Sequence, residues 1–157
     1  MKEIPLSKGK VAIVDDDMYD YLMQWKWHYG TAYALRHIYL GKRKQSNRFM
    51  HHEILQPPEG MYVDHIDRNK LNNTRDNLRT CTRTQNQANK CKRKDNTSGM
   101  KGVSWHKESR KWRATMTVDR KHVNVGYFRS KEDAYNAYIK KSKELYGEFA
   151  YQGTEAE

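Results

Sequence analysis

The stretch that decides the fold is MYVDHIDRNKLNNTRDNLRTCTRTQNQANKCK, residues 61–92. Residues 61–67 predict a short strand, and an asparagine-rich polar turn follows over residues 68–76. Residues 77–79 predict a second short strand. A helix is predicted from residue 82 through residue 92, because a threonine at its start and a glutamine three positions later form a capping box. The segment is therefore interpreted as strand, turn, strand and helix in close succession.

Three polar residues recur at set places in this unit. His65 ends the first strand beside Asp64, Asn77 opens the second strand twelve positions later, and Asn86 lies in the helix nine positions further on. An Asp-His pair alone is more often a surface turn than a site. Taken with the order of elements, the pattern resembles the HNH nuclease motif, or ββα-metal fold, and most closely its homing-endonuclease branch. The resemblance covers residues 49–92 and extends to Met50, His51, Glu53, Ile54 and Leu55 ahead of the first strand.

The resemblance implies hydrolysis of phosphodiester bonds with the help of a divalent cation. Asp64 and Asn86 carry hard oxygen donors, which suit Mg²⁺ or Mn²⁺ with several waters retained. His65 is expected to be the general base, because an imidazole with a pKa of about 6.5 accepts a proton from water near neutral pH. Asn77 is expected to do no chemistry; its amide is predicted to bond to the loop backbone and hold His65 in place.

Residues that flank the motif leave alternatives open. Asn89, one helical turn beyond Asn86, is a rival metal ligand, although we favour Asn86. Asp67 is either an additional ligand or, as we favour, a turn-former. Five basic side chains form either a solvated charged surface or a set of phosphate contacts, and beside a nuclease motif we favour phosphate contact. They are Arg75, Arg79, Arg83, Lys90 and Lys92.

The composition favours a nucleic acid as the partner, and the resemblance implies that it is double-stranded DNA. The 157 residues include 30 Lys and Arg against 19 Asp and Glu, which gives a formal charge of +11, together with eleven Tyr and four Trp. The segment 61–98 is the most basic per residue. Basic excess of this kind, combined with many aromatic side chains, is typical of proteins that bind nucleic acid.

Other classes of protein are disfavoured. The longest aliphatic run, residues 11–14, is far shorter than a membrane span, and no signal-peptide core follows Met1, so a cytoplasmic location in a bacterial or phage-infected host cell is expected. Cys81 and Cys91 fit neither a zinc knuckle nor a secreted disulfide scaffold and are predicted to be thiols.

The first third of the chain predicts a hairpin around residues 7–9 and then a helix that starts at the acidic run 15–17, with Tyr19, Leu22 and Met23 as its apolar stripe. Trp25 and Trp27 are predicted to open another extended stretch. At two-residue spacing they are either one face of a core strand, which we favour, or a base-stacking platform.

The last third predicts three strands within residues 101–128, separated by turns at 108–110 and 119–121. Side chains of the second strand alternate, with Trp112, Ala114, Met116 and Val118 on the apolar face. A helix after Ser130, capped by Asp133 and ended by Gly147, is predicted to cover that face with the stripe Ala134, Ala137, Tyr138 and Leu145.

Five short motifs in this region resemble the AP2 DNA-binding domain: KGV at 101–103, KWRA at 111–114, VGYF at 125–128, EDA at 132–134 and GEFA at 147–150. The resemblance covers residues 98–150 and implies a sheet that reads bases in the major groove. Several of the matching positions carry Arg, Glu or Trp in the plant transcription factors, so the target is not implied. The expected DNA-contacting residues are Lys101, Ser104, Arg113, Thr115, Thr117, His122 and Asn124.

The sequence therefore predicts an α+β protein of two modules. Residues 1–92 form a small ββα-metal nuclease unit with an N-terminal hairpin and helix, residues 93–98 form a basic linker, residues 99–150 form a three-stranded antiparallel sheet packed on one helix, and 151–157 form a tail. A monomeric, nicking DNA endonuclease of the homing type is expected. The main alternative is a non-catalytic DNA-binding regulator with a degenerate nuclease fold; an RNA-binding protein is disfavoured because Trp112 belongs to the apolar face.

Overall fold

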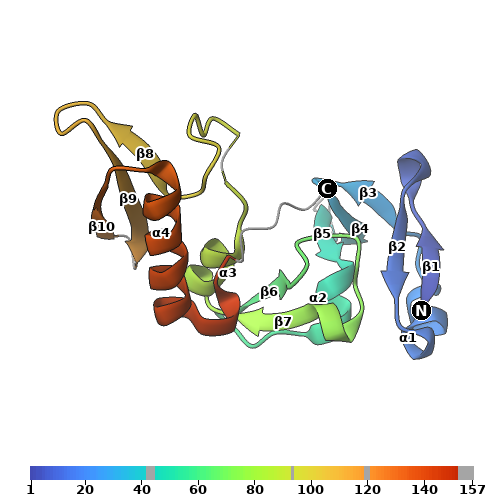
Figure 1. The fold of residues 1–157 in the computed structure, drawn as a ribbon. Coiled ribbons are helices and arrows are strands. Elements are labelled where there is room, and N and C mark those ends of the chain that lie inside the picture. Colours follow the sequence, from blue (N-terminus) through green and yellow to red (C-terminus); the bar gives the residue numbers. More distant parts are fainter. Residues whose placement is uncertain (42–44, 93, 119–120, 152–157) are drawn as a thin grey trace. The chain divides into compact units, whose positions relative to one another are not determined.

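The computed structural model describes residues 1–41, 45–92, 94–118 and 121–151. It divides into two compact units, Met1–Thr82 and Arg83–Glu157 (Figure 1). Small antiparallel sheets and α-helices make up both units, so the α+β class is confirmed. Arg93 of the predicted linker, residues 119–120 of a predicted turn and residues 152–157 of the tail lie outside the described residues.

The first unit opens with the predicted hairpin. Strands β1 (Lys2–Pro5) and β2 (Val11–Val14) pair antiparallel through the 3-10 turn η1 (Ser7–Gly9). Lys8 and Gly9 have φ angles of 62° and 64°, and this left-handed conformation, which glycine adopts readily, reverses the chain. The hairpin prediction is confirmed.

Helix α1 (Asp16–Leu22) begins at the predicted acidic run, where carboxylates lie favourably near the amide end of the helix. Leu22 is fully buried and Tyr19 packs against the same core. Met23 is 44% exposed because it follows the last residue of the helix, so its assignment to the apolar stripe is wrong.

Trp25 and Trp27 lie just before the second sheet. This sheet is formed by β3 (His28–Gly30), β4 (Tyr33–Tyr39) and β5 (Gln45–Phe49), with β4 in the middle. Trp27 is buried and its Nε1 donates to a backbone carbonyl of α1 at 2.8 Å, while Trp25 packs against the same core. The core interpretation is confirmed. Their placement in a strand is wrong, because both residues precede β3.

Helix α2 (Met50–Leu55) is fixed to this sheet by a buried carboxylate. Oε1 of Glu53 accepts hydrogen bonds from Arg36 of β4 at 2.9 Å and from Arg48 of β5 at 2.8 Å. Burial alone would raise the pKa of Glu53, but the two guanidinium groups outweigh it and lower that pKa. Met50, the first residue of α2, is fully buried in the core of the unit, so α2 is held at its start and again at Glu53.

The hairpin of the motif ends the first unit. Strand β6 (Tyr62–His65) pairs antiparallel with β7 (Leu78–Cys81), which confirms two strands joined by a long loop. Asn77 was predicted to open the second strand. It lies instead in the 3-10 turn η2 (Arg75–Asn77), where its side chain bonds to the loop, so that placement is wrong.

The second unit begins with α3 (Arg83–Asn89), which starts where the sequence predicts but ends three residues short of Lys92. The three predicted strands are confirmed as β8 (Val103–His106), β9 (Lys111–Val118) and β10 (Lys121–Phe128), with β9 in the middle. Helix α4 (Lys131–Tyr146) packs against one face of this sheet (Figure 1).

The core of the second unit follows the predicted alternation. It contains Val103, Ala114, Met116, Ala134 and Tyr138. Ser130 accepts a hydrogen bond from the Asp133 amide at 3.0 Å, and Gly147 ends α4 with a φ of 53°, so both caps are confirmed. Leu145 is 43% exposed, so its assignment to the stripe is wrong. Its neighbour Tyr146, in the same turn of α4, faces the sheet and donates through its hydroxyl to the Thr117 carbonyl at 3.3 Å.

Two further predictions concern the covalent and membrane state of the chain. Cys81 and Cys91 carry thiols and are not joined in a disulfide, as predicted. Among the helices of the described residues, none combines the length and apolar character needed to cross a membrane.

Candidate functional site

His65 ends β6 as a buried imidazole, only 5% exposed. Its Nε2 lies 3.4 Å from Oδ1 of Asn73. Asn73 is fully buried, and its Nδ2 donates to the Leu71 carbonyl at 3.1 Å, which turns Oδ1 toward the imidazole. An acceptor at Nε2 assigns the ring proton to that nitrogen. Nδ1 is then the atom of neutral His65 that can accept a proton.

The surroundings of His65 favour its neutral form. Burial is the largest cause and lowers the pKa of His65 below its usual 6.5. The charge of Lys70 acts in the same direction, whereas the bond to Asn73 and the carboxylates of Asp67 and Asp64 oppose it. A general base must be unprotonated before it acts, so this environment fits the role expected of His65.

Asn77 fastens the loop that follows His65. Its Oδ1 accepts from the Asp67 amide at 2.9 Å, and its Nδ2 donates to Oδ1 of Asp67 at 2.8 Å and to the Asn72 carbonyl at 2.7 Å. The predicted bonds from Asn77 to the loop backbone are therefore present. Oδ1 of Asp67 also accepts from the Asn69 amide at 2.8 Å, a side-chain turn that favours the turn-former alternative for Asp67.

The same loop is tied to the N-terminal hairpin. The Ile13 amide donates to the Leu71 carbonyl at 2.8 Å, and the Asn73 amide donates to the Ile13 carbonyl at 2.7 Å. Sequence reasoning missed the part of Asn73, which stood in the turn without an assigned role. It also missed Lys70, which lies on this loop 4.6 Å from the centre of the Tyr33 ring. The only sequence signal for Asn73 was the density of asparagines in the loop. That signal does not identify which asparagine is buried, because burial of an amide depends on a partner elsewhere in the fold.

Asp64 is buried on β6 beside His65. Because successive side chains of a strand point to opposite faces, the carboxylate and the imidazole flank the strand. Oδ2 of Asp64 accepts from Nε and Nη2 of Arg79, its cross-strand neighbour, at 3.0 and 2.8 Å. The predicted metal ligand and one predicted phosphate contact are therefore bonded to each other.

The donors near this position fit a hard cation that keeps several waters. Within the described residues, no group of three or more His, Cys, Asp or Glu side chains is placed to hold a metal ion. A cation at Asp64 would therefore draw on amide oxygens and water, which Mg²⁺ tolerates. Asn86 is half-buried and Asn89 is buried, both on α3. They belong to the second unit and Asp64 to the first, so their joint action stays a prediction.

Arg75, another predicted phosphate contact, is engaged within the first unit. Its Nη1 donates to both carboxylate oxygens of Asp17, at 2.9 and 2.6 Å, and its backbone amide donates to Asp15 at 2.8 Å. These contacts tie the start of η2 to α1. A phosphate contact by Arg75 stays a prediction. For this contact the guanidinium of Arg75 would have to leave the Asp17 carboxylate and bind a phosphate instead.

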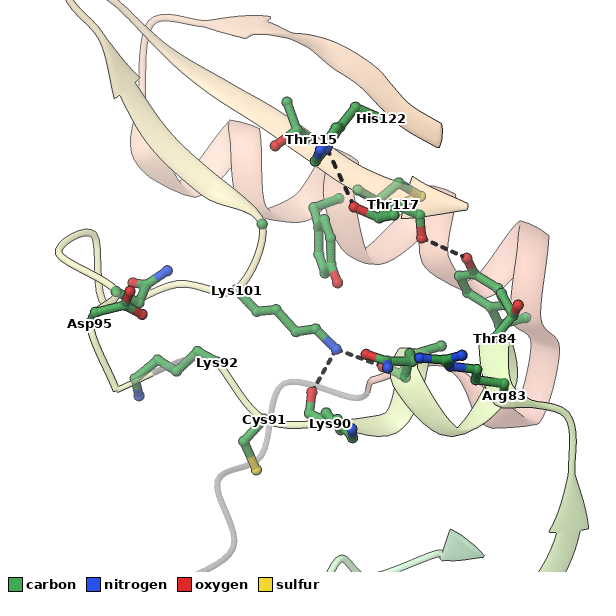
Figure 2. A pocket seen from close by; sticks show the side chains of 17 residues that line it. Arg83, Thr84, Lys90, Cys91, Lys92, Asp95, Lys101, Thr115, Thr117 and His122 are labelled. Carbon is green, nitrogen blue, oxygen red and sulfur yellow. Dashed lines mark hydrogen bonds between the residues drawn. The ribbon is translucent and has the colours of Figure 1, made fainter. Parts of the chain in front are cut away.

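The second unit contains a basic groove of about 920 Å³ between α3 and the sheet. Lys101 crosses it and donates through Nζ to the carbonyls of Ala88 and Lys90, both at 2.6 Å, at the C-terminal end of α3 (Figure 2). Lys101 thus holds the helix end, a function that the sequence did not indicate. Seven of the predicted DNA contacts line this groove: Arg83, Lys90, Lys92, Lys101, Thr115, Thr117 and His122.

The predicted base-reading residues share one face of the sheet. The register places Thr117 opposite His122, whose Oγ1 and Nδ1 atoms are 3.4 Å apart, and α4 covers the other face. The remaining cross-strand pairs of this polar face are Thr115 with Asn124 and Ser104 with Arg113. The structure brings these six residues together, while their contact with DNA stays a prediction.

Comparison with known proteins gives the class to which this fold and site belong. A sequence model of the HNH endonuclease family matches residues 56–88. Protein 3.8 of Escherichia phage T7 is 43% identical over 95 residues, which cover 59% of this chain and 76% of that protein. A protein of Acanthamoeba polyphaga mimivirus, named as an uncharacterized HNH endonuclease, is 35% identical over 146 residues, or 92% of this chain and 75% of that protein. No solved structure matches.

The chain therefore belongs to the HNH endonuclease family. Membership suggests nuclease activity and a DNA substrate, and it fits the small antiparallel hairpin and buried histidine described above.

Proposed function

We propose that the protein is a metal-dependent DNA endonuclease of the homing type, with His65 as its general base. The observation that carries this proposal is the buried imidazole of His65, whose Nε2 faces the amide oxygen of Asn73 and whose Nδ1 is left as the basic atom. Family membership supplies the reaction class, the hydrolysis of phosphodiester bonds.

The chain's own residues support a simple reaction course. Nδ1 of His65 removes a proton from a water molecule, whose oxygen attacks the phosphorus atom while the bond to the 3′ oxygen breaks. The leaving 3′ oxygen takes a proton from solvent. Asn73 holds the tautomer of His65 and Asn77 holds the loop. A Mg²⁺ or Mn²⁺ ion bound by Asp64 and Asn86 would supply charge stabilisation at the phosphate and at the leaving oxygen.

We further propose that the second unit is an AP2-like reader of double-stranded DNA. A centre that cuts phosphodiesters has little base preference, because phosphate contacts position a protein without specifying sequence. The polar face of the β8–β10 sheet offers hydroxyl, imidazole and amide groups suited to base edges in the major groove. The basic groove beside it suits the phosphate backbone.

One observation favours the alternative of a non-catalytic regulator. The carboxylate of Asp64 is paired with Arg79, so a cation must displace or share that guanidinium before Asp64 can act as a ligand. In a regulator the ion pair would be permanent, and the hairpin would serve only as a scaffold.

Supercoiled plasmid DNA distinguishes the two functions. The wild-type protein should convert it to relaxed circles with Mg²⁺ or Mn²⁺ and not with EDTA, and Asp64→Asn should be inactive at low metal concentration. Asp20→Asn, which removes an exposed carboxylate on α1, is the matched control and should cleave normally. DNA binding without metal-dependent cleavage by the wild-type protein would support the regulator instead.

The same assay tests the expected monomer. A chain with one His65 centre cuts one strand, so relaxed circles should accumulate before linear DNA, at a rate first order in protein. Linear DNA as the first product would indicate a paired enzyme. Because both relatives come from viruses, we propose that the protein acts in the cytoplasm of an infected host cell.

A further inference from the structure

His51 is a second buried imidazole near His65, and the reaction course above leaves it unused. It lies on α2 and is 6% exposed. The centres of the His51 and His65 rings are 5.1 Å apart, with their planes at 83°. Tyr33 and Phe49 place their rings 5.2 and 5.4 Å from that of His51. The ring of the neighbouring His52 lies closer, at 4.5 Å. Four rings, one of them the expected base, therefore surround this side chain.

One ring nitrogen of His51 lacks a hydrogen-bond partner among the described residues. Its Nδ1 is buried and has no hydrogen bond to any of the residues that the structure describes. A buried polar atom without a partner costs free energy, and a phenylalanine would fill a similar space among these rings without that cost. Packing alone therefore does not explain an imidazole here. A group that binds at Nδ1 during the reaction does.

The position of His51 is fixed by its helix. Two residues further along α2, Glu53 is bonded to Arg36 and Arg48 of the neighbouring sheet. Burial, with smaller contributions from His65 and His52, lowers the pKa of His51 to about 3, so the ring is neutral at physiological pH. A neutral ring held beside His65 can accept a hydrogen bond without competing for the proton that His65 removes.

We propose that His51 is a further catalytic residue, which orients the attacking water. One hydrogen of that water passes to Nδ1 of His65 as a proton, the other is hydrogen-bonded to Nδ1 of His51, and the oxygen lone pair points at the phosphorus atom. This inference rests on the proposed nuclease function. It adds a water-binding group on α2, ahead of the hairpin, to which no role has been assigned above.

Isosteric substitutions test the use of Nδ1. His51→Asn places an amide near the position of Nδ1, His51→Gln places it near Nε2, and His51→Phe keeps the ring shape without either nitrogen. Single-turnover cleavage of plasmid DNA with Mg²⁺ is measured beside DNA affinity in EDTA and the unfolding midpoint. His37→Phe, an exposed histidine of β4 bonded to Asn47, is the matched control.

Loss of one hydrogen bond in the transition state corresponds to about a tenfold lower rate. His51→Phe should therefore cleave about tenfold more slowly with unchanged DNA affinity, whereas His51→Asn should stay within about threefold of wild type. Wild-type cleavage by His51→Phe would overturn the inference. If His51→Phe does not fold, the cleavage rates of His51→Asn and His51→Gln are compared instead. A faster rate for His51→Asn would support the inference, and equal rates would overturn it.

Cleavage by His65→Ala, measured in parallel, distinguishes a failure of the His51 role from a failure of the proposed nuclease function. Inactive His65→Ala with fully active His51→Phe refutes the role of His51 alone. Normal cleavage by His65→Ala refutes the proposed nuclease centre, and with it the water-binding role of His51.

Discussion

The β6–β7 hairpin and the β8–β10 sheet are both small antiparallel structures rich in polar side chains, and they place these side chains in opposite ways. In the hairpin and its loop, His65, Asn73 and Asn77 are buried; His65 is hydrogen-bonded to Asn73, and Asn77 is hydrogen-bonded to the loop backbone at Asn72. In the sheet, Thr117 and His122 lie exposed on one face, while the apolar side chains form the core on the other. The chemistry proposed for the hairpin would therefore depend on a fixed geometry, whereas the recognition proposed for the sheet would depend on an open surface that tolerates change.

Among the residues that hold the two structures in shape, the largest effect is expected from Asn77→Ala in the loop of the hairpin. The change removes three hydrogen bonds that hold the loop after His65. Loss of three part-buried hydrogen bonds should cost about 1–3 kcal/mol of stability, and a loop displaced by about 1 Å should lower the cleavage rate about 100-fold. Chemical denaturation and single-turnover cleavage measure the two effects.

Asn69→Ala is the control for this prediction. Asn69 is exposed in the same loop, and its Oδ1 accepts a single hydrogen bond, from the Leu71 amide. It should change either quantity only slightly. Equal losses of stability and cleavage rate in the two variants would show that the Asn77 side chain does not fix the loop. The hairpin would then not differ from the sheet in its dependence on buried polar side chains.

The next largest effect is expected from Glu53→Gln. This variant tests whether the buried, hydrogen-bonded region around His65 extends to α2. A buried carboxylate with two guanidinium partners is lost, and since Arg48 is partly exposed we expect the low end of the usual range, about 3 kcal/mol. The folded-state pKa of Glu53 lies below its usual 4.5, so its stabilisation is present above that value and disappears as the pH falls through the lowered pKa.

Urea unfolding of wild type and Glu53→Gln from pH 7 to pH 3 measures that difference. The gap in unfolding free energy should be widest at pH 7 and should close under acid conditions. A gap that does not depend on pH would mean that the carboxylate charge contributes nothing.

A smaller effect is expected from His122→Ala on the open face of the sheet. The fold should be unaffected, because the side chain is exposed and opposite the core. Discrimination between a preferred and a substituted target should fall by about 1 kcal/mol, or about fivefold. Target selection from a random DNA pool followed by affinity measurement tests this, and a destabilised fold would contradict the description of this face.

The smallest effect is expected from Arg83→Ala in the basic groove. Loss of one phosphate contact should weaken binding to all sequences alike and reduce the slope of log affinity against log salt by about 1. Lys140→Ala, an exposed cation of α4 outside the groove, should leave the slope unchanged. Equal slopes for the two variants would mean that the groove does not contact the backbone.

The sequence predicted the second unit well because its structure follows local rules. Alternation in β9, the capping box at Ser130 and the glycine that ends α4 each specify their element from nearby residues. The error at Leu145 arose because periodicity gives the helix face on which a residue lies without giving how far that residue is buried.

The hairpin was predicted in outline, and its interior was not. The motif located His65 and Asn77. The contacts of Asn73 with Ile13 and of His51 with His65 join separate elements of the fold, and no local pattern encodes them. The ion pair between Asp64 and Arg79 was missed for the same reason, since it depends on the register of β6 and β7. Lys101 was expected to contact DNA, and only the fold reveals its bonds to the end of α3.

The most direct test of the account is single-turnover cleavage and DNA affinity of His65→Ala, measured on the same DNA and beside the wild-type protein. Removal of the general base should lower the Mg²⁺-dependent cleavage rate by about 10²–10⁴-fold, while affinity stays within a few-fold, because the base acts in the transition state and not in binding. Cleavage at the wild-type rate, or a loss of affinity as large as the loss of rate, would contradict the assignment of His65 as the base of a locked nuclease centre.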